Sequence, residues 1–122
     1  MSDELRILLA DRVVDGRGGQ PISRGYVAIQ GERILEVGPA EAATEERFPP
    51  EIPREDFGDC TIMPGLVDGH VHLTFSAGPV PFEDIQKDSD SAQLLRAAAN
   101  ARAALQAGVT TLRDLGSRGH VV

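Results

Sequence analysis

The sequence is poor in aromatic residues and in cysteine. Its 122 residues include four Phe, one Tyr and no Trp, so only 4% are aromatic and the core must rest on Val, Leu, Ile and Ala. The single cysteine, Cys60, cannot form an internal disulfide, which favours a reducing compartment. Because Cys60 has no basic neighbour, we expect a buried, unreactive thiol.

Long apolar runs and clusters of basic residues are also missing. No segment approaches the ~20 apolar residues that a membrane helix needs, and the N-terminal residues do not have the pattern of a secretory signal. The formal net charge is −7 and the pI about 4.8, which argues against nucleic acid or an anionic membrane as a partner. We therefore expect a cytoplasmic protein.

The composition is otherwise that of an ordinary globular chain, with 41% hydrophobic and 25% charged residues. Acidic residues are concentrated in residues 41–56, which also hold three prolines and predict a solvated loop. A glycine-rich run at residues 15–19 has the spacing of neither phosphate-binding loop and indicates a turn.

The first sixty residues have a β-rich pattern. Residues 6–14 are apolar enough for a strand or two, and residues 57–63 predict another short strand. Residues 26–30 and 33–37 predict a hairpin with a two-residue turn. These few short strands with polar turns predict only a partial sandwich or sheet over residues 1–63.

Residues 64–122 predict a strand, a loop, a helix and a second strand. Residues 66–73 alternate between two faces, residues 91–108 carry an apolar stripe at helical spacing, and residues 109–116 begin with β-branched residues. A strand–helix–strand unit of this length has parallel strands and a right-handed crossover.

The predicted helix has signals at both ends. Asp90, with Gln93 three residues later, resembles a capping box, and Gly108 is well placed to end the helix. We expect the apolar stripe of the helix to cover the aliphatic face of the preceding strand. The stripe comprises Leu94, Leu95, Ala98, Ala101 and Leu105, and the aliphatic face comprises Val67, Val71 and Leu73.

Two histidines lie two positions apart in the first strand of this unit. Since side chains alternate between the faces of a strand, His70 and His72 point the same way, together with Asp68. Two neutral imidazoles directed at one point suit a metal ion. The same pattern also fits a half-exposed strand whose polar face meets water, so the pair alone leaves both interpretations open.

The ordered set of motifs is more specific than the histidine pair. TIMPGLVDGHVHL (61–73), a Pro/Gly-containing loop, an alanine-rich helix and AGVTTLRDLG (107–116) resemble the metal-dependent amidohydrolase superfamily. The resemblance is greatest to its imidazolonepropionase-like and Xaa-Pro-dipeptidase-like branch. Residues 10–39 resemble the small β-sandwich that such enzymes build around their barrel.

The resemblance implies an α/β fold. Residues 1–63 would form the β-sandwich portion, and residues 64–122 the first strand–helix–strand unit of a TIM-like (β/α)8 barrel. Because such a barrel takes about 250 residues, it would be incomplete in this chain. The implied cofactor is a divalent metal, zinc foremost, as one or two ions. His70 and His72 match the pair that ligates the more buried metal, and Asp68 matches a supporting position.

The resemblance also implies an activity, which is hydrolysis of a non-aromatic C–N bond by metal-activated hydroxide. The substrate would be a small amide, dipeptide, cyclic amide, urea or carbamate. Related enzymes take further histidines and an aspartate from later strands. We therefore expect this segment to be inactive unless a C-terminal region or a second chain completes it, and we expect homo-oligomers. The alternative is a non-catalytic binding or assembly module related to these enzymes.

Four other residues of this half are candidates for lesser roles. Asp114 is expected to have a loop or salt-bridge role, and His120 is assigned none. Phe75 and Phe82 follow the histidine strand, where a barrel places substrate contacts, although a loop without function explains them equally well.

Overall fold

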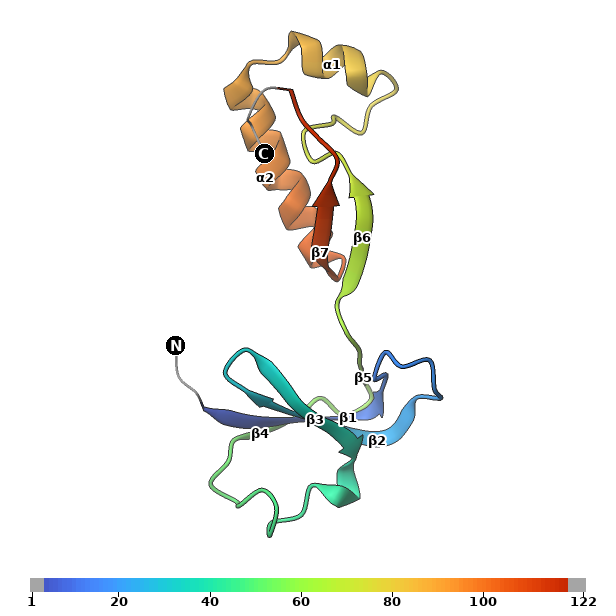
Figure 1. Cartoon of the computed structure of the whole chain (residues 1–122), viewed down its shortest axis with the longest axis vertical. Helices are drawn as coiled ribbons and strands as arrows, with labels where there is room; N and C mark the ends of the chain where they lie inside the picture. The colour runs from blue at the N-terminus through green and yellow to red at the C-terminus, as the bar shows by residue number, and fades with distance from the viewer. Residues whose placement is uncertain (1–3, 119–122) are drawn as a thin grey trace. The chain divides into compact units, whose positions relative to one another are not determined.

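The computed structural model describes residues 4–118. The chain divides into two compact units, Met1–Pro64 and Gly65–Val122. The described part of the first unit is formed mainly of strands, and that of the second unit contains two strands and two α-helices (Figure 1). The protein is therefore of the mixed α/β class. No helix between residues 4 and 118 is long and apolar enough to cross a membrane.

One mixed sheet forms the first unit. Its strands β1 (Leu5–Val13), β2 (Ile22–Gln30), β3 (Arg33–Pro39) and β4 (Arg54–Asp56) lie in the order β3-β2-β1-β4, and β5 (Thr61–Ile62) also pairs with β1. β2 is antiparallel to both β1 and β3, whereas β4 and β5 run parallel to β1.

The predicted hairpin is confirmed. Gln30 of β2 pairs with Arg33 of β3, so two residues connect the strands. Gly31 occupies the turn with a φ of 56°, a left-handed conformation that glycine adopts without steric cost.

The acidic segment is exposed and mostly irregular, as its composition predicts, but it is not solvated throughout. It contains the 3-10 helix η1 (Ala40–Ala42) and ends in β4. Phe48 is 6% exposed and packs edge-on against Tyr26, with ring centroids 5.7 Å apart. The segment therefore completes the core of the first unit, because its few apolar residues fold inward while its charges face water. The core cluster comprises Ile7, Tyr26, Ala28, Ala43 and Phe48.

Residues 57–63 form less strand than the sequence predicts. Only Thr61–Ile62 pairs with β1, and the preceding residues turn at Gly58, whose φ is 59°. Cys60 lies in this turn. Its side chain is therefore exposed, whereas the sequence predicted a buried one.

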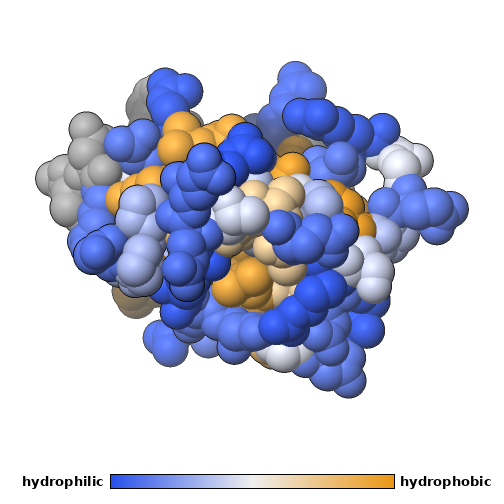
Figure 2. Space-filling model, turned by 90° about the horizontal axis from the view of Figure 1, so that it is seen from below, coloured by the Kyte–Doolittle hydropathy of each residue, from blue (hydrophilic) through white to orange (hydrophobic). Residues whose placement is uncertain are grey.

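Apolar surface also appears among the hydrophilic residues in Figure 2. The large exposed apolar residues of the first unit are Ile34, Leu35, Phe57 and Met63.

The second unit contains the predicted parallel strand–helix–strand arrangement. β6 (Leu66–Val71) pairs in parallel with β7 (Val109–Asp114), and α2 (Asp90–Gln106) connects them. In Figure 1, α2 lies alongside β7, and the additional helix α1 (Pro81–Lys87) lies beyond the carboxyl ends of both strands. α1 falls where a loop was expected; Pro81 occupies its first turn, a position that proline favours.

α2 buries a different face from the predicted one. Leu94, Leu95 and Leu105 of the predicted stripe are 54%, 73% and 62% exposed. The buried residues of the helix are Gln93 and Ala97 instead. The prediction of the leucine stripe as the packing face was wrong for the described residues, because polar contacts, described below, turn the other face of α2 inward.

The aliphatic face of β6 is only partly covered by the described residues. Val67 is 71% exposed, whereas Val71 and Leu73 are half-buried. The sequence pattern predicted that the helix covers this face. In the structure it does not cover the face along the whole strand.

The start of α2 differs from the prediction by one residue. Ser89 is the N-cap, and its hydroxyl oxygen accepts a hydrogen bond of 3.2 Å from the N–H of Ala92. Asp90 is then the first helical residue, where its negative charge interacts favourably with the positive end of the helix dipole. Gly108 follows the helix with a φ of 89°, which agrees with the predicted end.

Candidate metal centre

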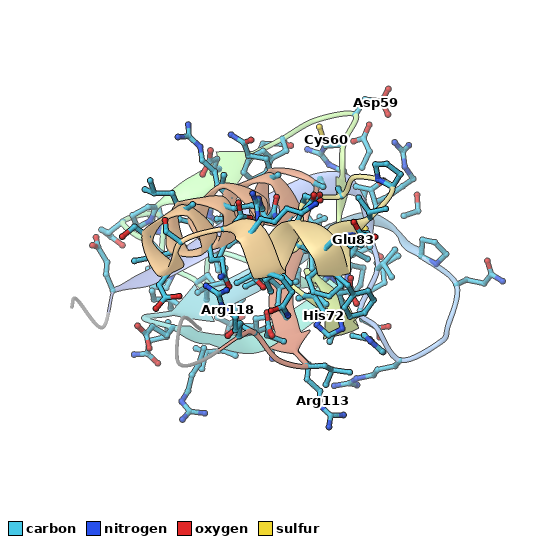
Figure 3. All side chains as sticks on the ribbon, turned by 90° about the horizontal axis from the view of Figure 1, so that it is seen from above. Asp59, Cys60, His72, Glu83, Arg113 and Arg118 are labelled. Carbon is cyan, nitrogen blue, oxygen red and sulfur yellow. The ribbon has the colours of Figure 1, made fainter. Side chains whose placement is uncertain are left out.

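Both candidate histidines lie at the carboxyl end of β6, which faces the viewer in Figure 3. His70 belongs to the strand, and His72 lies directly beyond its last residue. The centroids of the two rings are 5.4 Å apart. Two imidazoles that share one zinc at Zn–N distances of about 2.0–2.1 Å have centroids no more than roughly 6.5 Å apart. The separation therefore fits a shared ion.

His72 is held by a hydrogen bond and by an aromatic ring. Its Nδ1 lies 3.0 Å from the carbonyl oxygen of Gly116, and its ring stacks on that of Phe75 with centroids 4.5 Å apart and planes 14° from parallel. A carbonyl oxygen can only accept, so this hydrogen bond assigns the proton to Nδ1 and leaves the lone pair of Nε2 free. Metal-binding histidines are commonly oriented in this way.

Asp68 contacts the backbone of the strand that carries the histidines. Its Oδ1 accepts a hydrogen bond of 3.0 Å from the N–H of His70. The pairing of β6 with β7 is irregular between Asp68 and Val71, and a local side-chain hydrogen bond of this kind satisfies backbone groups where a ladder is interrupted. Asp68 thus shapes the strand at His70, while its supporting role towards a metal stays a prediction.

Asp114 joins the carboxyl ends of β6 and β7. Its Oδ2 accepts a hydrogen bond of 2.9 Å from the N–H of Leu73, and its Oδ1 accepts one of 2.7 Å from the N–H of Gly116. The N–H of Leu115 also donates to the carbonyl of Val71 at 3.0 Å. Asp114 therefore acts on the loops that follow both strands.

Polar residues of α2 hold the loop after β6. The side-chain amide of Asn100 donates to the carbonyls of Leu73 at 2.7 Å and Phe75 at 3.0 Å. Arg96 donates to the carbonyl of Thr74 at 3.1 Å. These bonds fix the three residues that follow His72 from the helix side.

The apolar pattern of α2 did not predict these contacts, although a polar pattern in the same helix could have indicated them. Gln93, Arg96 and Asn100 recur at helical spacing in an alanine-rich helix and mark a polar stripe. The amide of Gln93 donates to the carbonyls of Ile85 at 3.3 Å and Asp88 at 3.4 Å. The hydrogen bond to Asp88 raises the pKa of Arg96 above its ordinary value, so this guanidinium stays charged.

Of the two phenylalanines considered as substrate contacts, Phe75 stacks on His72 and Phe82 contacts Phe75. Phe75 meets Phe82 edge to face, with centroids 4.8 Å apart, and Phe82 is 70% exposed. α1 carries Phe82 and is anchored by a hydrogen bond of 2.6 Å from the Ser76 hydroxyl to Asp84. An exposed aromatic ring is therefore connected to His72 through Phe75.

The donor set of the described residues is incomplete for a catalytic metal. Between residues 4 and 118, no three His, Cys, Asp or Glu side chains are grouped so as to hold an ion. A catalytic zinc usually has three protein ligands and a water, and His70 and His72 provide two. His120 lies outside the described residues.

Comparison with known proteins places these features in a family. Residues 61–121 match the model of the amidohydrolase family. An allantoinase from Streptomyces avermitilis is 32% identical over 115 residues, which make up 94% of this chain and 21% of the allantoinase. The chain thus spans about a fifth of the length of this curated relative.

Two solved structures are similar over nearly the whole chain. A Xaa-Pro dipeptidase with bound methionine in its active site is 25% identical, with a TM-score of 0.76 over 97% of this chain and 28% of the dipeptidase. A molinate hydrolase is 29% identical, with a TM-score of 0.70 over 93% of this chain and 24% of the hydrolase.

Proposed function

Because the chain belongs to the amidohydrolase family, we propose that it forms part of a metal-dependent hydrolase of a non-aromatic C–N bond. The substrate class is a small amide, dipeptide, cyclic amide, urea or carbamate. The observation that carries the proposal is the pair His70 and His72 at the end of β6, with Nε2 of His72 left free by the Gly116 carbonyl.

His70 and His72 would hold a divalent ion, for which zinc is the first candidate because imidazole nitrogen suits it. When bound, such an ion lowers the pKa of a water ligand to about 7 and polarises a carbonyl oxygen. The chain's own contribution is orientation. Asp68 fixes the backbone at His70, and the loop contacts fix the ring of His72.

The site would be completed by further ligands from a C-terminal region or a second chain. The chain spans only about a fifth of the allantoinase, and its described residues supply one pair of histidines. We propose that residues 64–122 supply the first strands of a TIM-like barrel and that residues 1–63 supply a portion of a β-sandwich. Leu66 and Val67 are exposed apolar residues of β6, which supports the proposal that further parts of a barrel cover this strand.

The proposal is tested by metal analysis of the complete protein that contains this chain. The His70→Ala/His72→Ala variant should lose bound metal, and its activity should fall by more than the roughly 10–100-fold typical of changes outside the ligand shell. Arg102→Ala, an exposed position on α2, is the matched control and should keep both. Equal metal content in the double variant and the wild type would contradict the assignment.

The second candidate is a non-catalytic binding or assembly module. It is favoured by one observation, the incomplete donor set of residues 4–118. It predicts that the complete protein folds and binds its partner equally well with and without both histidines, which the same double variant tests.

A further inference from the structure

Three hydrogen bonds connect Asp114 to the surroundings of His72. Asp114 Oδ1 accepts from the N–H of Gly116 at 2.7 Å, and the Gly116 carbonyl lies 3.0 Å from His72 Nδ1. Asp114 Oδ2 accepts from the N–H of Leu73, the residue after His72, at 2.9 Å. One carboxylate therefore holds both the backbone next to the histidine and the peptide that pairs with its ring.

The Gly116 backbone presents its carbonyl to His72 in an unusual conformation. Its φ of 127° lies in the left-handed half of conformational space, which is open to glycine and costly for other residues. An added Cβ at Gly116 would meet nothing within 4 Å, so the requirement is on the backbone and not on space. The hydrogen bond to Asp114 supports this conformation, because it satisfies the N–H of the same residue.

The other contacts described for His72 do not select which ring nitrogen carries the proton. Stacking on Phe75 fixes the plane of the ring but does not distinguish its two nitrogens. Asn100 binds carbonyls of the loop and not the ring. Only the Gly116 carbonyl, among the contacts described for this ring, selects a proton on Nδ1. An imidazole released from it can carry the proton on Nε2, which blocks that nitrogen as a ligand.

We propose that Asp114 is a positioning residue that acts on His72 through Gly116, fixing the tautomer and orientation in which Nε2 can bind a metal. The proposal rests on the metal role proposed for His72 and assigns a function to a carboxylate that binds the backbone N–H groups of Leu73 and Gly116. Its expected scale is the roughly 10–100-fold in metal affinity that outer contacts of a ligating histidine contribute.

The test is nitrogen NMR of the histidine rings in the complete protein, free of metal and in the neutral imidazole form. The His72 signals are assigned by their loss in His72→Gln. We expect the wild type to carry the proton on Nδ1 and Asp114→Asn to show a mixture with the Nε2 form. Zinc titration of the same samples should show binding about 10–100-fold weaker in Asp114→Asn. Asp59→Asn is the matched control, because the Asp59 side chain is 84% exposed.

The outcomes separate this proposal from the proposed function. An unchanged His72 tautomer in Asp114→Asn overturns the role of Asp114, even if zinc binds His72. A shifted tautomer in a protein whose wild type binds no zinc supports the link from Asp114 to the ring and contradicts the metal site. If Asp114→Asn does not fold, Gly116→Ala gives the same readout through the backbone. A Gly116→Ala variant that keeps the wild-type tautomer overturns the proposal.

Discussion

In the first unit the fully buried residues Ile7 and Tyr26 form an apolar core with Phe48, whereas in the second unit the fully buried side chains of Thr74 and Gln93 are polar. The first unit thus has the usual apolar inside, although Ile34, Leu35, Phe57 and Met63 are exposed on it. The second unit leaves large apolar residues on its described surface, among them Leu66, Val67, Phe82, Leu94 and Leu95.

The difference shows what positions the candidate site. Around His72 the loops are held by side-chain hydrogen bonds from Asp114 and Asn100, not by a continuous apolar core. Thr74 and Gln93 even keep a buried oxygen each without a partner among the described residues, which is unfavourable in a stable interior. Hydrogen bonds of this kind give geometric precision, while the leucines of α2 stay exposed among the described residues.

The largest expected effect contrasts the core of the first unit with the exposed leucines of the second. Ile7→Ala should lower the free energy of unfolding by about 2–5 kcal/mol, because it opens a cavity in the apolar core. Leu95→Ala should change it by no more than about 0.5 kcal/mol, because Leu95 is 73% exposed. Urea denaturation of the chain of residues 1–122 measures both. Equal losses would show that the leucine stripe is packed after all.

A smaller effect is expected where the second unit relies on hydrogen bonds. Asn100→Ala leaves the carbonyls of Leu73 and Phe75 without the amide that binds them, and should lower the free energy of unfolding by about 1–3 kcal/mol. Amide hydrogen exchange in residues 73–75 should accelerate with it. The neighbouring exposed position Arg102→Ala should leave both unchanged, and similar behaviour of the two variants would contradict the role of Asn100.

The cap of α2 should contribute less. Ser89→Ala removes the hydroxyl that accepts from Ala92 and should cost about 1 kcal/mol. Asp90→Ala should cost less, about 0.3–1 kcal/mol, because it removes a favourable interaction with the helix dipole and an exposed ion pair of 3.0 Å with Arg118, which contributes little in water. Thermal or urea unfolding of the two variants ranks them. The reverse order would restore Asp90 as the capping residue.

The last prediction concerns the pH dependence of stability, and it applies only in alkaline solution. Burial and the hydrogen bond to Glu36 raise the pKa of Tyr26 from 10.0 to about 12. The neutral phenol is thus favoured in the folded state, so its contribution to stability is complete below pH 10 and is lost as the pH rises to about 12. Tyr26→Phe should remove this part of the pH dependence of unfolding. The same slope in both proteins would contradict the shift.

Local signals in the sequence predicted the local parts of the fold. The hairpin required only alternating residues on either side of Gly31, and the end of α2 only Gly108. The parallel pairing of β4 with β1 could not be predicted, because three exposed, charged residues have no local strand signal. The leucine stripe showed which face of α2 is apolar but not which face its neighbours cover.

For the candidate site, too, the sequence predicted the local features but not the contacts between distant residues. His70 and His72 stand out in the sequence because they lie two positions apart in a predicted strand, and their rings are close in the structure. The contacts that orient them are distant in sequence, as the separation of 44 positions between His72 and Gly116 illustrates. No periodicity in a single sequence indicates such a pair, so the role of Asp114 emerged only from the structure.

The central claim, that the histidine pair binds a metal, is tested most directly by X-ray absorption at the zinc edge of the complete, zinc-loaded protein. The fine structure counts the imidazoles around the ion. The account predicts that His70→Ala/His72→Ala either loses zinc or binds it with two fewer imidazoles, while Arg102→Ala keeps the wild-type spectrum. A double variant with the full zinc content and an unchanged number of imidazole ligands would contradict it.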